Sequence, residues 1–208
     1  MKIKRLGPGD NELCRQAAYL HIRSIHHGLL PLLGNQFLTK MYLCIAVAPE
    51  AGVWAMADGD KLVGFIAGCA SVRRTYRWLM LNHGFRLALA TGPALFRFGV
   101  LAKLCSILSY PLRRRKVPAN ALVPEAELLA IAVDADEYGK GYGRNLIQAF
   151  EVSLRQWGVH EYRVLTNIAE TESNAFYRAT GFMPAGTIRH HALTLQVYEK
   201  RSFSKADL

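Results

Sequence analysis

Apolar positions in the first fifty residues predict a short strand followed by two helices. The strand covers residues 3–6, and Asp10 or Asn11 can cap a helix that continues to about residue 26. Apolar side chains recur on one face of this helix at roughly helical spacing. A second helix is predicted over residues 36–47, and a turn follows it.

The next residues have the pattern of a β-hairpin. Two apolar runs, 53–57 and 62–67, flank the dipeptide Asp58-Gly59. Asp-Gly between apolar runs favours a tight turn, because glycine tolerates positive φ. Residues 72–120 are then predicted to form helices broken by a Gly-Pro pair, and this stretch is a candidate insertion.

A strand–loop–helix–strand pattern opens the C-terminal part of the chain. Residues 127–133 are a nearly continuous apolar run of strand length, and the glycine-rich residues 134–143 follow. An amphipathic helix over 145–157 and a strand over 162–166 complete a βαβ-like unit. A short helix and a last strand are predicted after this unit, over 172–180 and 193–198.

Length and composition indicate a single folded domain over residues 1–208. Hydrophobic residues make up 51% of the chain and charged residues 20%, which excludes a disordered protein. The four cysteines include no C-x-x-C pair, so we expect reduced, mostly buried thiols and not a disulfide framework. The N-terminus lacks the apolar region of a secretory signal, and charges interrupt the longest apolar stretch, so a cytoplasmic location is expected.

The net charge of +10 belongs to one segment of the chain. Residues 71–120 hold ten basic residues and no acidic one, while the rest of the chain holds equal numbers of both. Three interpretations stay open: a solvated basic face, recognition of an anionic acceptor by arginine–phosphate pairing, and docking on a membrane or an acidic partner. No nucleic-acid partner is expected, because the neutral remainder carries no recognised reader motif.

The sequence Tyr138-Gly-Lys-Gly-Tyr-Gly-Arg144 carries the strongest chemical signal. Three glycines at alternate positions let the backbone approach a ligand closely, and free N–H groups at the start of the following helix favour an anion such as a pyrophosphate. Lys140 and Arg144 add positive charge. The spacing is neither the dinucleotide-binding G-x-G-x-x-G nor a P-loop, and a plain tight turn is the alternative interpretation.

With a second motif, this loop resembles the GNAT family of N-acetyltransferases. That family carries Gln/Arg-x-x-Gly-x-Gly/Ala between a strand and a helix, and later an Asn…Tyr-x-x-x-Gly-Phe helix end. Gly141 and Gly143 match the first motif, whereas Tyr138 stands where the family prefers Gln or Arg. The second motif is matched by Asn174, Tyr177, Gly181 and Phe182. The resemblance is firm over residues 122–185 and supportive over 1–70, where residues 62–68 look like the family's third strand.

The resemblance implies an α/β fold, a mixed and mostly antiparallel twisted sheet with helices on both faces. The insertion 72–120 would lie between the third and fourth strands. Two central strands are expected to splay apart at a bulge and to admit the pantetheine arm of acetyl-CoA. The residues expected to hold acetyl-CoA are Ile131, Ala132, Val133, Tyr138, Gly139, Lys140, Gly141, Tyr142, Gly143, Arg144, Asn167, Asn174 and Tyr177.

The resemblance also implies acetyl transfer to an amine. Tyr177 is the candidate acid that protonates the leaving thiolate, and a tyrosine packed on a helix is the alternative. Glu127 is the candidate base that takes the amine proton, with a salt-bridging acid as the alternative interpretation and Glu125 as a weaker candidate base. Three histidines near the expected acceptor site are predicted to be solvated or capping residues, with a substrate-binding or base role as the alternative: His21, His26 and His27.

The predicted function is transfer of an acetyl group from acetyl-CoA to the primary amine of a small molecule. A phosphorylated or nucleotide-linked amino sugar is the first acceptor hypothesis, because of the basic segment. The alternatives are a peptide N-acetyltransferase and a non-catalytic CoA-binding or membrane-associated module. No set of His, Cys, Asp and Glu has metal-ligand spacing, so no metal is expected. A homodimer stays open.

Overall fold

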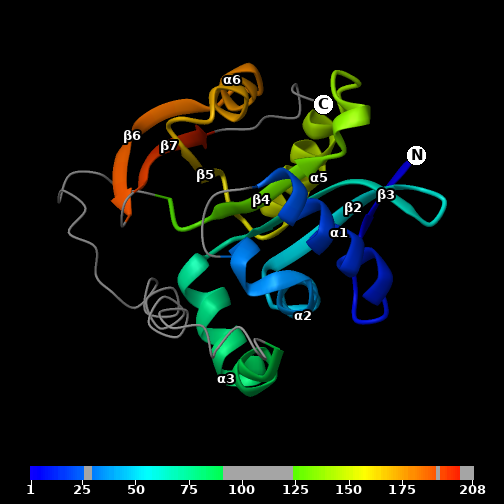
Figure 1. The fold of residues 1–208 in the computed structure, drawn as a ribbon. Helices are drawn as coiled ribbons and strands as arrows, with labels where there is room; N and C mark the ends of the chain where they lie inside the picture. Colours follow the sequence, from blue (N-terminus) through cyan, green and yellow to red (C-terminus); the bar gives the residue numbers. More distant parts are fainter. Residues whose placement is uncertain (26–29, 91–123, 191–192, 202–208) are drawn as a thin grey trace.

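The computed structural model describes residues 1–25, 30–90, 124–190 and 193–201, and a seven-stranded sheet stands at its centre. The strand order is β1-β2-β3-β4-β5-β7-β6, and every neighbouring pair is antiparallel except β4 and β5 (Figure 1). The strand bounds are β1 Lys2–Arg5, β2 Ala51–Asp58, β3 Lys61–Cys69, β4 Glu127–Val133, β5 Glu161–Asn167, β6 Met183–His190 and β7 Leu193–Arg201. The predicted mixed, mostly antiparallel sheet is confirmed.

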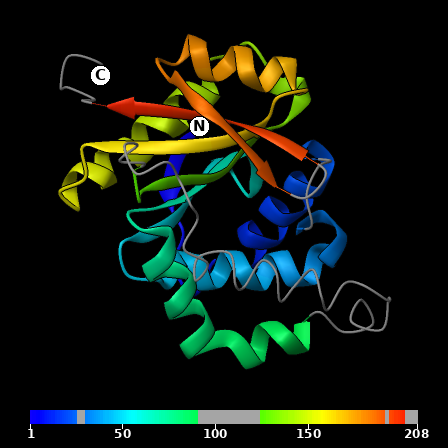
Figure 2. The same cartoon turned by 90° about the vertical axis from the view of Figure 1, so that its left-hand side faces the viewer.

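Helices cover both faces of this sheet. Figure 2 shows α1, α2 and α3 on one side and α5 and α6 on the other. The helix bounds are α1 Asn11–Ser24, α2 Gly34–Val47, α3 Val72–Ala90, α5 Tyr142–Gln156 and α6 Thr171–Ala179, with 3-10 turns η1 at Leu30–Leu33 and η3 at Ala135–Glu137. A sheet covered on both faces needs apolar residues at successive strand positions. This explains the unbroken apolar runs of β2 and β3, which are buried over most of their length.

Gly68 in β3 sets how closely α5 approaches the sheet. A Cβ atom at this position would lie 2.4 Å from the ring of Phe150, a fully buried residue of α5. The glycine in this apolar run therefore serves the packing of α5 on the sheet. Since α5 begins at the glycine-rich loop, this contact also helps to fix the position of that loop.

The two parallel strands at the centre of the sheet separate soon after they pair. Only Glu127 and Leu128 of β4 are in register with β5, opposite Arg163 and Val164. On the other side of β4 the register with β3 shifts at Ala67/Gly68, which is the geometry of a β-bulge. Beyond Leu128, β4 therefore has a strand partner on one side and a gap on the other.

The predicted elements are confirmed to within a few residues, with one exception. Strand β6 was not predicted, because its sequence begins Met-Pro-Ala-Gly and most of its described residues are exposed, so it has no apolar alternation. Of the predicted helical insertion 72–120, α3 accounts for residues 72–90. The remainder of the insertion, Cys105, His26 and His27 lie outside the described residues.

Helix α2 and the turn before it form one segment that is apolar and long enough to cross a membrane, Leu30–Val47. In the fold this helix buries Phe37, Leu38, Met41 and Tyr42 among the core residues between α1, α3 and the sheet. Its apolar character is therefore explained by its place as a core helix.

His21 of α1 is buried, which corrects the prediction of a solvated or capping residue. It is 3% exposed, its Nδ1 atom lies 2.6 Å from the hydroxyl oxygen of Tyr42, and its ring stacks near Phe65. Burial lowers its pKa from 6.5 to about 4, because the interior disfavours the charged ring. The histidine is thus a neutral part of the core at neutral pH.

We expect this histidine to make the fold sensitive to mild acid. Between pH 6.5 and 4 the unfolded chain protonates His21 and the folded chain does not, so stability falls as the pH falls through this window. The full effect is roughly 3 kcal/mol, from about 1.4 kcal/mol per pKa unit. Urea unfolding at several pH values measures this loss of unfolding free energy. In His21→Gln the loss between pH 6.5 and 4 should be smaller by this amount. The exposed His160→Gln variant should keep the wild-type profile.

Candidate functional site

The loop between β4 and α5 is built by glycines in the left-handed region. After η3, where the Asp134 side chain accepts a hydrogen bond from the Asp136 N–H, the chain turns at Gly139 with φ +78° and at Gly141 with φ +80°. Other residues are strained at such angles. Gly139 and Gly141 are therefore required by the backbone path.

Helix α5 begins at this loop with open N–H groups. Gly141 stands at its N-cap, no side chain caps the helix, and the first helical bond runs from the Asn145 N–H to the Gly141 carbonyl. The N–H groups of Tyr142, Gly143 and Arg144 consequently have no partner within the helix. Three such donors at the positive end of a helix dipole form a favourable site for a phosphate or pyrophosphate.

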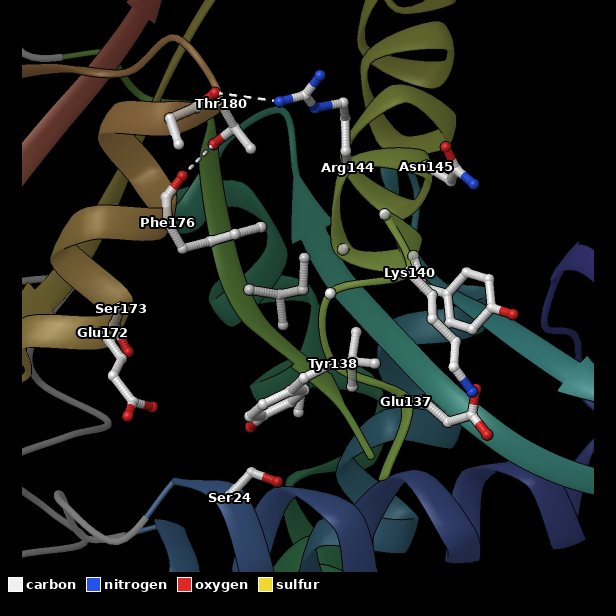
Figure 3. Close-up of a pocket in the computed structure, with 18 of the residues that line it drawn as sticks. Ser24, Glu137, Tyr138, Lys140, Arg144, Asn145, Glu172, Ser173, Phe176 and Thr180 are labelled. Atoms are coloured by element: carbon white, nitrogen blue, oxygen red, sulfur yellow. Dashed lines mark hydrogen bonds and ion pairs between the residues drawn. The ribbon is translucent and has the colours of Figure 1, made fainter. Parts of the chain in front are cut away.

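A cavity of about 610 Å³ lies over these donors (Figure 3). Loop residues, the end of β4, the start of α5, α6 and the end of α1 form its wall. The lining residues are Ser24, Ile25, Ile131, Ala132, Val133, Glu137, Tyr138, Gly139, Lys140, Gly141, Tyr142, Gly143, Arg144, Asn145, Glu172, Ser173, Phe176, Tyr177, Ala179 and Thr180. Eleven of the thirteen residues predicted to hold acetyl-CoA are among them.

Gly143 lets α5 and α6 meet closely at this cavity. A Cβ atom at this position would lie 2.9 Å from the ring of Phe176 on α6. The third glycine of the motif therefore serves packing between the two helices, whereas Gly139 and Gly141 serve the backbone conformation. The two sequence motifs, far apart along the chain, are thus in contact.

Two cations stand at the cavity wall. Lys140 Nζ is 2.8 Å from a carboxylate oxygen of Glu137, and the Arg144 guanidinium donates to the Ala179 carbonyl at 3.4 Å (Figure 3). The lysine charge is balanced by its neighbour, and its exposed pair contributes little stability. The Arg144 bond is long, so this arginine is the cation more readily turned toward an anionic ligand.

The gap between β4 and β5 forms the inner end of the cavity. Ile131, Ala132 and Val133 line it, at the positions where β4 has no neighbour on its β5 side. The free edge of a strand offers backbone N–H and C=O groups to an extended ligand. An amide-containing chain such as pantetheine fits this edge.

Tyr177 of α6 lies beside this gap, with its ring packed in an aromatic cluster. The side chain is 7% exposed, and its ring contacts those of Phe176, Phe182 and Tyr198. Within the described residues its hydroxyl has no hydrogen-bond partner. Burial raises the pKa of Tyr177 well above its ordinary value, so it stays protonated and available as a donor.

Asn174 and Asn167 are the two predicted binding residues outside the cavity lining. Asn174 donates from its amide to the carbonyls of Asn167 at 2.9 Å and Glu170 at 2.6 Å, and it accepts from the Tyr198 hydroxyl at 3.0 Å. These bonds fasten α6 to the end of β5. A direct contact of either asparagine with the coenzyme stays a prediction.

Glu127, the candidate base, lies at the start of β4. It is 7% exposed and forms an ion pair with Arg163 of β5, with 2.8 Å between Oε2 and Nε. It is not part of the cavity lining. Its neighbour Glu125 is exposed and accepts a hydrogen bond from Ser71 at 2.9 Å.

The structure adds wall residues that the motifs do not contain. Ser24 and Ile25 come from the end of α1, and Figure 3 shows Ser24 facing Tyr138 across the cavity. Glu172 and Ser173 come from the start of α6, and Thr180, at its end, occupies a position that the second motif leaves unspecified. Their contribution depends on tertiary packing, which no local pattern indicates. No group of metal-ligating side chains occurs within the described ranges.

Anion binding by the N–H groups at the start of α5 should depend on the conformation of Gly141 in particular. Gly141→Ala places a Cβ in the left-handed region at φ +80°, which distorts the turn that aims the helix N–H groups. We expect acetyl-CoA affinity to fall by about tenfold or more, or at least ~1.4 kcal/mol. Gly158→Ala is the matched control, since Gly158 has φ +72°, open space around it and a place at the far end of α5. Calorimetry should show its affinity unchanged, although both variants lose similar stability.

Comparisons with known proteins agree with this geometry. Residues 22–182 match the model of the acetyltransferase (GNAT) family. A search of curated proteins finds no significant match.

Among solved structures the chain is similar to aminoglycoside 6'-acetyltransferase type Ii, at 16% identity and TM-score 0.59, over 97% of each chain. It is also similar to the ribosomal-protein-S18-alanine N-acetyltransferase from Escherichia coli, at 14% identity and TM-score 0.57, over 100% of this chain and 97% of that one. A GNAT-family acetyltransferase from Streptococcus pneumoniae has 13% identity and TM-score 0.57, over 97% and 98%. At these identities the likeness shows the fold alone.

The family match covers most of the chain and contains both the glycine-rich loop and the Tyr177 helix. Members of this family use acetyl-CoA as a co-substrate, and the cavity has the helix N-terminus and free strand edge that suit its pyrophosphate and pantetheine arm. The chain belongs to the acetyltransferase (GNAT) family and is an acyl-CoA-dependent N-acetyltransferase.

Proposed function

We propose that the chain acetylates the primary amine of a small molecule and that its first acceptor class is phosphorylated or nucleotide-linked amino sugars. The observation that carries the acceptor class is the charge of the 71–120 segment, which holds ten basic and no acidic residues. Arginine pairs with phosphate through two parallel hydrogen bonds. A phosphorylated acceptor would therefore gain affinity from this segment that a neutral amine would not.

The described part of that segment starts close to the candidate base. The Val72 N–H donates to the Glu125 carbonyl at 3.1 Å, so the first turn of α3 adjoins the start of β4. Arg73 and Arg77 are exposed on this half of α3 and form no ion pair with the described residues, whereas Arg74 pairs with Glu50 at 3.0 Å. This arrangement supports Arg73 and Arg77 as phosphate contacts of the acceptor.

The proposed reaction is direct attack of the amine on the thioester carbonyl. The amine nitrogen forms the new C–N bond, the C–S bond breaks, and the electron pair leaves with sulfur. The amine proton passes to the Glu127 carboxylate, through water because Glu127 lies outside the cavity lining. The Tyr177 hydroxyl donates its proton to the thiolate, and the cleft excludes bulk water from the thioester.

We propose that backbone groups do most of the coenzyme binding. The N–H groups at the start of α5 would hold the pyrophosphate, with Arg144 as the assisting cation. The free edge of Ile131–Val133 would hold the pantetheine amides. Tyr138 is exposed and replaces a residue that is usually Gln or Arg in the family, so its side chain adds no charge to the cradle.

Free-thiol release from acetyl-CoA tests the acceptor class. The acceptors are a nucleotide-linked amino sugar, an amino-sugar phosphate, the unphosphorylated amino sugar and a peptide with a free N-terminus. We expect the highest kcat/KM for the phosphorylated pair. Arg73→Ala with Arg77→Ala should raise KM for these two by about tenfold and leave the neutral sugar unchanged. Arg15→Ala, which removes an arginine paired with Glu12 on α1, is the control. A preference for the peptide would contradict the proposal.

We also propose that the protein is cytoplasmic and that it forms a homodimer. A cytoplasmic location is supported by the buried, free thiols of Cys14, Cys44 and Cys69, which suit a reducing compartment. Light scattering at several concentrations tests the homodimer.

A further inference from the structure

We propose that the C-terminal half of α3 docks on an anionic membrane surface. The carrying observation is a row of exposed apolar side chains on this helix. Leu81 is 75% exposed, Phe85 77% and Leu89 63%. These residues are four positions apart, so they lie one above another on one face of the helix. The inference does not depend on the identity of the acceptor.

The opposite face of α3 already fixes the helix to the protein. Val72, Thr75, Leu79 and Leu87 are buried, and α3 packs on α2. The apolar row therefore lies on a different face of α3 from the one that packs on the protein, and among the described residues nothing covers it. A leucine, a phenylalanine and a second leucine in one exposed row give the helix a strip that favours an apolar environment.

Charge identifies the partner as an anionic surface. Arg86 is exposed beside the apolar row, and α3 holds four arginines and no acidic residue. Exposed leucine and phenylalanine next to basic residues, on a helix without acids, suit contact with a membrane interface. Anionic headgroups would attract Arg86, and the apolar side chains would enter the boundary of the acyl chains.

The two halves of α3 can thus have separate roles. Arg73 and Arg77 lie in the half that adjoins β4, while Leu81, Phe85 and Leu89 lie in the second half, which follows a bend and runs beside α2 (Figure 2). Docking by the far half leaves the cavity at α5 and α6 open to ligands.

Vesicle sedimentation of the full chain tests the proposal. The probes are vesicles of phosphatidylglycerol with phosphatidylcholine and vesicles of phosphatidylcholine alone. We expect binding to the anionic vesicles, much weaker binding to the neutral ones, and release as salt rises toward about 0.5 M. The double variant Leu81→Glu with Phe85→Glu should lower the bound fraction on the order of tenfold, because it replaces apolar contact by repulsion.

A matched control separates docking from general exposure of apolar groups. Met183 is 70% exposed on β6, so Met183→Glu removes a similar exposed residue from a different face and should bind vesicles as the wild type does. Acetyl-CoA affinity and thermal midpoint should be unchanged in all variants, which shows that they fold.

Three results would overturn the proposal. One is equal or absent binding to both vesicle types. Another is undiminished binding of the Leu81/Phe85 variant, which would place the contact elsewhere in the chain. The third is a change of oligomeric state or a marked loss of stability in that variant, which would show that the row is covered by a second copy or by another part of this chain.

Discussion

Tyr177→Phe is expected to lower kcat by roughly 10²–10³-fold, the range of a lost general acid, and to leave acetyl-CoA affinity nearly unchanged. The ring would keep its contacts with Phe176, Phe182 and Tyr198, so the pocket wall is preserved. Only the hydroxyl is lost, and with it the proton for the leaving thiolate. Steady-state kinetics with a saturating acceptor and calorimetric titration of acetyl-CoA measure the two quantities.

Tyr162→Phe is the matched control for this prediction. Tyr162 lies in the same aromatic cluster against Phe182, and its hydroxyl donates to Glu151 at 2.6 Å. Its loss should cost stability of about 1–2 kcal/mol through the broken buried bond, with little effect on kcat. Tyr177→Phe should instead lower kcat and leave stability nearly unchanged, since no described residue forms a hydrogen bond with its hydroxyl. An unchanged kcat in Tyr177→Phe would remove this residue from the proton-donor role.

Glu127→Gln is expected to lower kcat/KM by about 10²-fold near neutral pH, because the amide cannot accept the amine proton. The loss should shrink as the pH rises toward the pKa of the acceptor amine, where the amine is deprotonated without help. If Glu127 had only a structural role, the loss of kcat/KM in Glu127→Gln would stay the same as the pH rises. The measurement is the pH profile of kcat/KM for both proteins.

Glu125→Gln is the comparison for Glu127. Glu125 lies only two residues from Glu127, so Glu125→Gln removes the same charge from the same part of the chain. Unlike Glu127, however, Glu125 is exposed and accepts a hydrogen bond from Ser71. We expect its kcat/KM to stay near that of the wild type. A large loss in Glu125→Gln with normal activity in Glu127→Gln would transfer the base role to Glu125. Circular dichroism of Glu127→Gln is the control for folding, because the substitution alters the ion pair with Arg163.

Local patterns were sufficient for the elements that build the candidate coenzyme site. The strand at 127–133 is a short apolar run, and α5 has a regular apolar face formed by Leu146, Ile147, Phe150 and Leu154. The glycine-rich loop between them needs specific backbone angles, which restrict its sequence. Signals of this kind depend on residues near one another in the chain, and the structure confirms them.

Features that depend on distant contacts were not predictable in the same way. His21 carries a polar side chain on a predicted helix, and only the packing of Tyr42 and Phe65 from other elements makes it buried. Ser24 and Ile25 reach the cavity because the end of α1 lies opposite the loop. Strand β6 pairs along its length with β7 while its side chains stay mostly exposed, so hydrogen bonding and not burial defines it.

Calorimetric titration of the full chain with acetyl-CoA tests the central claim most directly. The open N–H groups at Gly141 and the free edge of β4 predict saturable binding at one site per chain, weakened in Gly141→Ala and unchanged in Gly158→Ala. A ligand that binds only the folded state must also raise the thermal midpoint. Absence of both heat and thermal shift, or equal binding by the two glycine variants, would contradict a coenzyme site between β4, the loop and α5.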